Sequence, residues 1–365
     1  MKIKYLLAAF ISLSINSIFA MEHETKMHTS MGDHHGKMHE GSMHDAKMHA
    51  PIGVMGDHYH RRGEFMASIR YMRMDMGKNA LGSRGISDQE VIELPNPFAM
   101  SGMPTKLSVV PKSMIMDMVM IGGMYAPSDN LTWMGMIMLK DKSMDLTTYN
   151  SMMNRDKLGK FSTGSSDASN IAISALLRIQ ETQTTRLHAQ IGVEKSIGEN
   201  SEIGSVLTPM NVKKEMIMPY GMQNGDNSIS LLTALTFTKT YDQWKMGYQF
   251  NSKNSIQKDD WSFGDKLELN IWTQRDFSKS SAWSLRMKYQ KTDPIDGRNV
   301  LISAPVQTAN PSNYGGKDLS LGFGINYNLQ LGSIGLEIFK PIKQNLNGPQ
   351  MKTNWTAQMG YHFSF

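Results

Sequence analysis

Residues 244–251 read Trp-Lys-Met-Gly-Tyr-Gln-Phe-Asn, with a large apolar or aromatic side chain at every second position. Successive side chains of an extended chain point to opposite faces, so this stretch has one apolar and one polar face. The same period recurs at 283–290 and at 318–328. The pattern predicts β-strands that separate an apolar environment from a polar one.

Segments of this kind, about ten residues long and bounded by turn residues, repeat from Glu64 to the end of the chain. We expect strands at 65–76, 114–125, 131–140, 170–180, 183–194, 228–238, 241–252, 265–275, 282–291, 317–328, 333–340 and 353–365. Their number is even, as in bacterial barrels whose termini share one side of the membrane.

The connections between these segments alternate in length. Short connections are centred on Pro127, Glu181, Thr240, Phe277 and Leu331, and mostly much longer ones on Arg84, Arg155, Pro209, Lys258, Ile295 and Leu346. Outer-membrane barrels have short periplasmic turns and long extracellular loops, whereas a soluble β-sandwich has no reason to alternate in this way. The sequence therefore predicts an all-β fold, a transmembrane antiparallel β-barrel of about 12 strands in the bacterial outer membrane, with both termini periplasmic.

The start of the chain has the features of a signal peptide. Lys2 and Lys4 precede an apolar run at 5–15, and Ala20 is a small residue suited to signal peptidase. The run falls short of the roughly 20 residues that span a bilayer, which disfavours the alternative of a retained anchor. We expect residues 1–20 to be removed after export.

The end of the chain alternates as well. Met359, Tyr361, Phe363 and Phe365 project to one side, and the final residue is aromatic. This ending resembles the C-terminal assembly signal of bacterial outer-membrane barrels. The resemblance implies that the barrel assembly machinery and outer-membrane lipid are partners of the chain, which we expect to form a barrel over 63–365.

Composition excludes several functions. The chain has no cysteine, so disulfides, thiolate metal sites and thiol nucleophiles are absent. The net charge of +5 is spread without an aromatic-interleaved basic stripe, so no nucleic acid is expected as a partner. A mean hydropathy of −0.37 suits a barrel, because alternating faces average out.

Residues 21–62 form a segment of different composition, which we expect to be a disordered periplasmic arm. Candidate metal ligands in it are His23, Met27, His28, Met31, His34, His35, Met38, His39, Met43, His44, Met48 and His49. Thioether sulfur suits Cu(I) and Ag(I), and imidazole accepts Cu(II), Zn or Ni. The spacing fits no structural zinc site, so we expect several exchangeable ions and no required cofactor. The alternative is a solubilising linker without a metal-related role.

Methionine also alternates in the first three predicted strands, at 72–76, 114–120 and 134–138. Neighbouring strands would bring these side chains into one sulfur-rich patch, in which Met116, Met118, Met134 and Met136 are the central candidate ligands. Polar residues on the methionine side of the first and third strands favour a lumen-facing patch. In the second strand Asp117 lies on the opposite side, which would place a carboxylate toward lipid, so a lipid-facing apolar patch stays open.

Three short segments resemble a known group of barrels: 71–76 (Tyr-Met-Arg-Met-Asp-Met), 124–132 (Met-Tyr-Ala-Pro-Ser-Asp-Asn-Leu-Thr) and 219–223 (Pro-Tyr-Gly-Met-Gln). The group consists of Met-rich outer-membrane proteins similar to the phenol-degradation transporter-like barrels. The resemblance covers most of the predicted barrel. It implies an association with copper-resistance systems.

Three functions follow as hypotheses. The first is a non-enzymatic barrel that binds or passes copper or silver, in metal handling or resistance. The second is an outer-membrane channel for small hydrophobic or aromatic compounds. The third is a barrel hydrolase, for which only His188 and His362 remain beyond the arm, without a recognisable triad pattern. We therefore expect no enzymatic activity.

Overall fold

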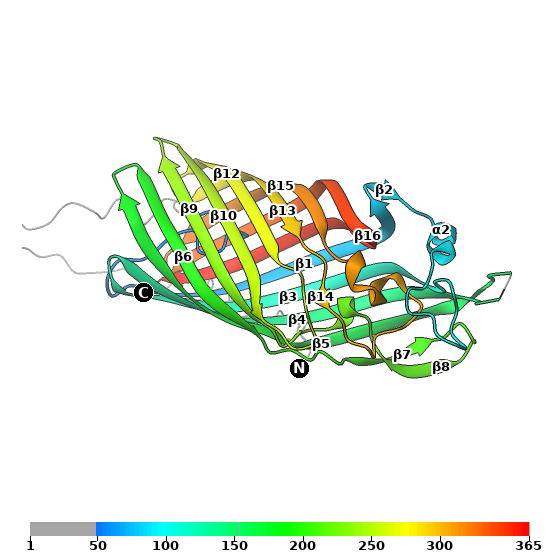
Figure 1. Ribbon diagram of the computed structural model, residues 1–365. Helices are drawn as coiled ribbons and strands as arrows, with labels where there is room; N and C mark the ends of the chain where they lie inside the picture. Colours follow the sequence, from blue (N-terminus) through cyan, green and yellow to red (C-terminus); the bar gives the residue numbers. More distant parts are fainter. Residues whose placement is uncertain (1–48, 153, 365) are drawn as a thin grey trace, which may run out of the picture.

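The computed structural model describes residues 49–152 and 154–364, and these fold into a closed antiparallel β-barrel (Figure 1). The wall consists of β1 (Phe65–Gly82), β3 (Val109–Ser128), β4 (Leu131–Tyr149), β5 (Lys157–Glu181), β6 (Thr185–Ser196), β9 (Ile229–Thr240), β10 (Trp244–Gln257), β12 (Lys266–Ser278), β13 (Ser281–Thr292), β15 (Gly316–Leu329) and β16 (Gly332–Ser364). Each strand pairs with the next in this order, and β16 pairs with β1 to close the sheet. Closure leaves the wall without an open edge.

The strand labelled β16 crosses the wall twice. Residues 332–346 pair with β15, and residues 346–364 pair with β1. The two halves of β16 lie side by side, so the run folds back on itself. Gln344 Nε2 of the first half donates to Thr353 O of the second at 2.9 Å. A Cβ atom on Gly332 would lie only 1.9 Å from the carbonyl oxygen of His362. Eleven labelled strands thus form the wall with twelve crossings, while β2 (Arg84–Gly85) lies outside it on β1. The predicted barrel is confirmed.

The two ends of the barrel differ as predicted. Connections at the end that carries the C-terminus span residues 129–130, 182–184, 241–243, 279–280 and 330–331. Longer connections at the opposite end contain α2 (Asp88–Glu93), β7 (Ile203–Leu207), β8 (Lys213–Ile217), η2 (Tyr220–Met222), β11 (Trp261–Ser262), β14 (Asp296–Gly297), η3 (Gln307–Ala309) and η4 (Pro311–Asn313) (Figure 1). We call these the terminal end and the loop end. The small elements of the loop end were not predicted, because they lack the ten-residue alternation of the wall.

The outer face carries an apolar band next to the terminal end. On β5, Ile171, Ile173, Leu177 and Ile179 are all exposed, over a length near the 9–11 residues, roughly, of a membrane-spanning strand. An apolar surface of this extent fits hydrocarbon rather than water. In the part of the chain that the structure describes, no helix is long and apolar enough to cross a membrane.

Several strands continue past this band. β1, β3, β4 and β5 have 18, 20, 19 and 25 residues, which exceeds the sequence-based ranges. Asp117 lies in such an extension, on the outer face beyond the apolar residues Val119 and Ile121 of β3. It pairs with Arg73 on β1 at 2.9 Å. A carboxylate outside the apolar band and paired with a guanidinium needs no burial in hydrocarbon, which removes the argument for a lipid-facing methionine patch.

Candidate functional site

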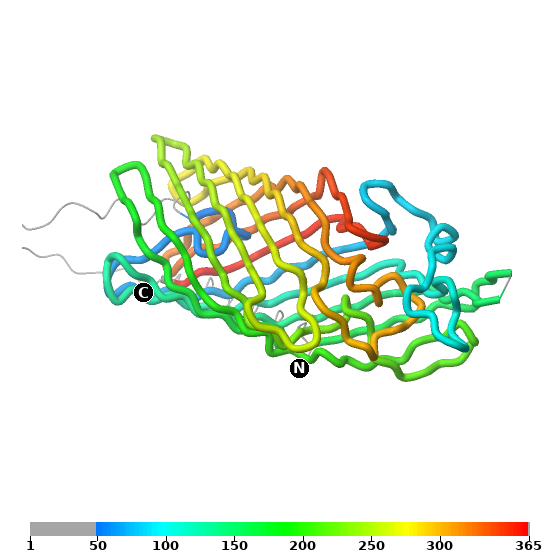
Figure 2. The backbone as a smooth tube through the Cα atoms, viewed as in Figure 1, coloured from blue at the N-terminus to red at the C-terminus, as the bar shows by residue number. Residues whose placement is uncertain are grey.

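Residues 49–62, which we call the plug segment, lie inside the barrel near the terminal end (Figure 2). The segment turns sharply, with Val54 N donating to Pro51 O at 2.9 Å and Gly56 at a φ of +58°. Ala50 and Val54 pack on Trp272 of β12. The expectation of a free arm over 21–62 therefore does not hold for this stretch, because its backbone has partners on the wall. The arm residues 21–48 and the signal peptide lie outside the described residues.

The wall holds the plug segment through its backbone. Wall donors bind its carbonyl oxygens: Arg70 to Ile52 (2.7 Å), His188 to Gly56 (2.8 Å), Gln249 to Met55 (2.8 Å), Gln274 to His49 (2.6 Å), and Asn326 to His49 (3.0 Å) and Ala50 (3.1 Å). Thr132 Oγ1 accepts from His60 N at 3.0 Å. These partners come from β1, β4, β6, β10, β12 and β15, so the segment is tied to most of the circumference.

Gly53 rests on a buried ion pair. Arg286 of β13 donates from Nε and Nη2 to the carboxylate of Glu337 on β16, both bonds 3.0 Å long, and each side chain is 1% exposed. Gly53 N donates to the same carboxylate at 2.9 Å. A Cβ atom on Gly53 would lie 2.2 Å from Arg286 Nη2. Only glycine fits here, because the ion pair fixes the side chains beneath it.

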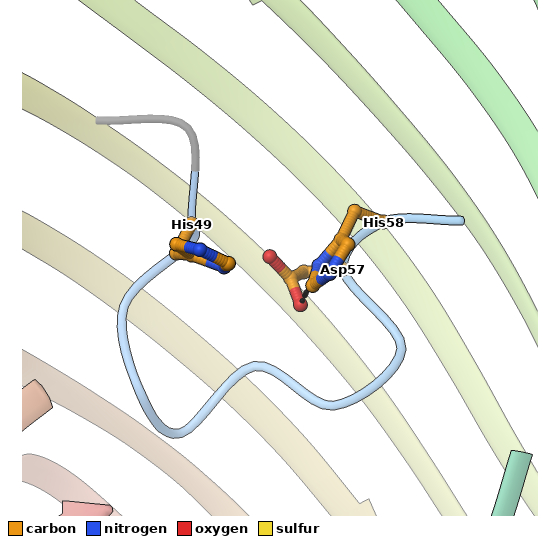
Figure 3. Close-up of side chains that lie close together, drawn as sticks. All are labelled: His49, Asp57 and His58. Carbon is orange, nitrogen blue, oxygen red and sulfur yellow. Dashed lines mark hydrogen bonds and ion pairs between the residues drawn. The ribbon is translucent and has the colours of Figure 1, made fainter. Parts of the chain in front are cut away.

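Three charged or ionisable residues of the plug segment form the first part of the candidate site. One ligand atom from each of His49, Asp57 and His58 lies within 4.8 Å of the others, and His58 Nδ1 contacts Asp57 Oδ1 at 2.9 Å (Figure 3). The ring of His60 follows at 4.9 Å from that of His58, between centroids. Imidazole and carboxylate are ligands of divalent transition metals.

The protonation states in this cluster favour metal binding. Burial, followed by the charge of His58, lowers the pKa of His49 to about 3 and that of His60 to about 4. Burial would raise the pKa of Asp57, but the charge and hydrogen bond of His58 hold that pKa well below its usual range. Near neutral pH His49 and His60 are thus neutral imidazoles and Asp57 is a carboxylate, which are the forms that bind metal.

The second part of the site is a methionine track on the inner wall. Arg70 and Met72 share one face of β1, and Arg70 reaches the plug segment, so this face lines the lumen. Across the sheet Met72 lies opposite Met118, and Met74 opposite Met116. The track comprises Met66, Met72, Met74 and Met76 on β1, Met114, Met116, Met118, Met120 and Met124 on β3, and Met134, Met136, Met138 and Met144 on β4.

The track runs from the plug segment to the loop end. At the plug, Tyr59 packs with Met66 and Met124, and Met134 lies against this cluster. At the loop end, Met114 and Met144 join Met218 and Met222 from the connection before β9. That connection lies against the inner wall, where Ser165 donates to Met222 O at 2.6 Å. Between these clusters the methionines are half-buried.

The predicted site residues thus fall into separate groups. Met116, Met118, Met134 and Met136 all lie on the lumenal face, as the lumen-facing hypothesis requires. They do not form one patch centre, because Met116 and Met118 lie opposite Lys142 and Lys140 of β4, whereas Met134 and Met136 lie opposite Met124 and Gly122 of β3. His49 lies in the plug cluster. The other candidates, His23, Met27, His28, Met31, His34, His35, Met38, His39, Met43, His44 and Met48, lie outside the described residues.

Sequence reasoning missed Asp57, His58 and His60 as a site. The signal was present, since three imidazole or carboxylate side chains fall within four residues. Its proximity to the His- and Met-rich arm 21–48 hides this signal, because histidine and acidic residues are frequent there too. His188 and His362, the two histidines weighed for catalysis, both face the plug segment: His188 donates to Gly56 O, and the ring of His362 lies 5.6 Å from that of His49, between centroids.

Comparison with known proteins identifies the fold. No family model matches the chain, and none of the curated proteins matches it. Among solved structures, an outer membrane channel from Pseudomonas putida F1 superposes with a TM-score of 0.53 at 9% identity, covering 86% of this chain and 100% of that one. Weaker matches include the P. putida toluene transporter TodX (TM-score 0.40, 12% identity, 83% and 90% covered) and the KdgM porin in complex with disordered oligogalacturonate (0.38, 8%, 82% and 99%). The chain has the fold of a bacterial outer-membrane β-barrel.

Proposed function

We propose that this protein is an outer-membrane channel whose methionine track binds soft metal ions, Cu(I) or Ag(I), inside the lumen. The supporting observation is the track itself, in which three adjacent strands present thioethers to the interior from the plug segment to the loop end. Thioether sulfur is a soft ligand, and the chain has no thiolate that would compete for such ions. The association of similar Met-rich barrels with copper resistance, implied by the sequence resemblance, agrees with this cargo.

The opposite wall is polar, which suits ions rather than bulky apolar solutes. Gln249, Asn270, Gln274 and Arg286 face inward from β10, β12 and β13, and all four are buried in the lumen. In the proposed orientation the terminal end faces the periplasm, since short turns lie on that side in outer-membrane barrels.

A second candidate function is a channel for small hydrophobic or aromatic compounds. Its supporting observation is that the same methionines accept aromatic rings: Tyr59 packs on Met66 and Met124, and Tyr220 packs in the cluster of Met114 and Met144. Thioether and aromatic groups attract each other, and flexible methionine adapts to varied ligands. A toluene-like solute would then take the place of the metal ion.

Ag(I) uptake by the protein in liposomes, together with toluene binding to the purified protein in detergent, separates the two functions. The soft-metal channel predicts uptake of Ag(I) above that of protein-free liposomes, which falls when Met116, Met118, Met134 and Met136 are replaced by leucine, and no saturable binding of toluene to either protein. Leucine keeps the apolar volume nearly constant and deletes the sulfur. Saturable toluene binding that survives the leucine replacements, together with no uptake of Ag(I), would instead support the second function.

A further inference from the structure

Three imidazole rings of the plug segment lie in a row, with His58 between His49 and His60. Ring centroids are 5.2 Å apart for His49 and His58, and 4.9 Å apart for His58 and His60. Around a tetrahedral ion with metal–nitrogen bonds of about 2.0–2.1 Å, the centroids of two imidazoles lie roughly 5 Å apart. The spacing in each of these two pairs therefore matches that of two imidazoles on one ion, and His58 is common to both pairs.

Two of these rings have a nitrogen free for a ligand bond and the other nitrogen fixed by a carboxylate. His58 Nδ1 contacts Asp57 Oδ1 at 2.9 Å, and His60 Nδ1 contacts Glu64 Oε2 at 3.2 Å. A neutral imidazole that donates from Nδ1 leaves its lone pair on Nε2. Metal-binding histidines commonly have this carboxylate partner, which fixes the tautomer and the ring orientation.

The free nitrogens are buried without a partner among the described residues. They are His49 Nδ1, His58 Nε2 and His60 Nε2, and the His60 residue is 8% exposed. Buried polar atoms are rarely left unsatisfied, because each costs free energy that a partner would recover. One cation beside all three nitrogens would satisfy them together.

His362 lies beside these histidines but is not one of the proposed metal ligands. Arg70 Nη2 lies 3.1 Å from His362 Nε2, and a guanidinium can only donate, so Nε2 accepts this bond. The remaining nitrogen of a neutral His362 then bears a proton and has no lone pair for a metal. His362 therefore lines the site without ligating, and the donors come from the plug segment alone.

We propose that His49, His58 and His60 bind a divalent cation such as Zn(II) or Cu(II), and that this ion fastens the plug segment in the barrel. Asp57 and Glu64 orient the rings of His58 and His60 for it. The inference goes beyond the proposed cargo, since imidazole nitrogen donors select borderline divalent ions whereas the methionine track selects soft monovalent ones.

The position of the ligands explains the fastening. His49 opens the turn and its carbonyl is held by β12 and β15, whereas His60 closes it and its N–H is held by β4. An ion shared between the two ends closes the loop 49–60, and the binding free energy stabilises the loop conformation. The metal-loaded protein is accordingly the plugged one.

Hydrogen–deuterium exchange of the full-length protein in detergent, with and without Zn(II), tests this proposal. With Zn(II) at about 100 times its dissociation constant, amides of the plug segment should exchange about 100-fold more slowly. His58→Ala should abolish the slowing. The control His35→Ala changes a histidine of the arm and should keep it. An unchanged rate in the wild type, or equal slowing in His58→Ala, would overturn the proposal.

A second variant is needed because His58→Ala could loosen the plug segment even without metal. His60→Gln leaves the Asp57–His58 contact and the backbone bond to Thr132 in place, so the segment should stay protected without Zn(II). It removes one ligand, and Zn(II) should then add little protection. Full Zn(II)-dependent slowing in His60→Gln would also contradict the site.

Discussion

Arg73 on β1 and Asp117 on β3 lie opposite each other and form a two-bond ion pair, with Arg73 Nε 2.9 Å from Asp117 Oδ1 and Nη2 3.0 Å from Oδ2. Tyr71 Oη donates to the same carboxylate at 2.6 Å. All three side chains are on the outer face, with Tyr71 beside Val119 and the Arg73–Asp117 pair beyond the apolar band. Because side chains alternate along a strand, the methionines at the positions between them face the lumen.

This pair should contribute measurably to stability. Asp117→Ala leaves the guanidinium of Arg73 without its partner near the membrane surface, and we expect the free energy of unfolding to fall by about 1 to 2 kcal/mol. The double variant Arg73→Gln/Asp117→Asn should recover part of this loss, since no unpaired charge remains. Urea unfolding in lipid vesicles measures both changes. A double variant no more stable than Asp117→Ala would show that the pair is not coupled.

A side chain at Gly53 should expel the plug segment. Gly53→Val places atoms against the Arg286–Glu337 pair, where a Cβ alone would lie 2.2 Å from Arg286 Nη2. We expect a folded barrel with a several-fold higher single-channel conductance in a planar bilayer. The matched control is Gly85→Ala, where a Cβ would meet no atom within 4 Å. Wild-type conductance in Gly53→Val would mean that the plug segment does not block the lumen.

Deleting residues 21–48 should leave the barrel and the plug segment intact, because the described contacts of the segment begin at His49. Heat-modifiable migration on a gel should therefore persist in a chain that keeps its signal peptide. The number of metal ions bound per chain should drop, since most candidate histidine ligands lie in the deleted stretch. Loss of the heat-modifiable form would show that this stretch is needed for folding.

Acid should loosen the connection before β9 through Asp226. Its carboxylate accepts from Phe263 N at 2.8 Å and Ser228 N at 3.0 Å. Burial would raise the pKa of Asp226, but these hydrogen bonds lower it below its usual value. The stabilisation is therefore present above the unfolded pKa of about 3.9 and is lost as pH falls through the lower folded pKa. Limited proteolysis should cut Asp226→Asn faster than wild type at pH 7, and the difference should vanish in strong acid.

Much of the fold follows from local alternation. Strand identity, the order of short and long connections, and closure of the sheet all depend on a period of two residues, which the sequence displays directly. The lengths of β3 and β5 do not. The start of β5 is mostly polar on both faces, and Val109-Val110-Pro111 at the start of β3 is apolar without alternation, so neither stretch has the two-residue period. The ten-residue pattern reports only the part of each strand that faces hydrocarbon.

The candidate site was predictable only in part. The methionine track could be located by alternation, but its orientation depends on the Arg73–Asp117 pair, which needs the register between two strands. The plug segment could not be found, since it is held through backbone atoms by side chains such as Gln274 and Asn326 from distant strands. Backbone contacts of this kind leave little trace in the composition of the segment itself.

The central claim is that the lumenal methionines bind soft metal, and the Cu(I) affinity of the chain lacking 21–48 tests it most directly. Replacing Met116, Met118, Met134 and Met136 by leucine should weaken Cu(I) binding strongly and leave Zn(II) binding nearly unchanged, because thioethers are poor ligands for Zn(II). The control replaces three methionines of the outer face, Met246, Met287 and Met359, by leucine and should bind Cu(I) like the parent. Equal Cu(I) affinity in the parent and the lumenal variant would contradict the claim.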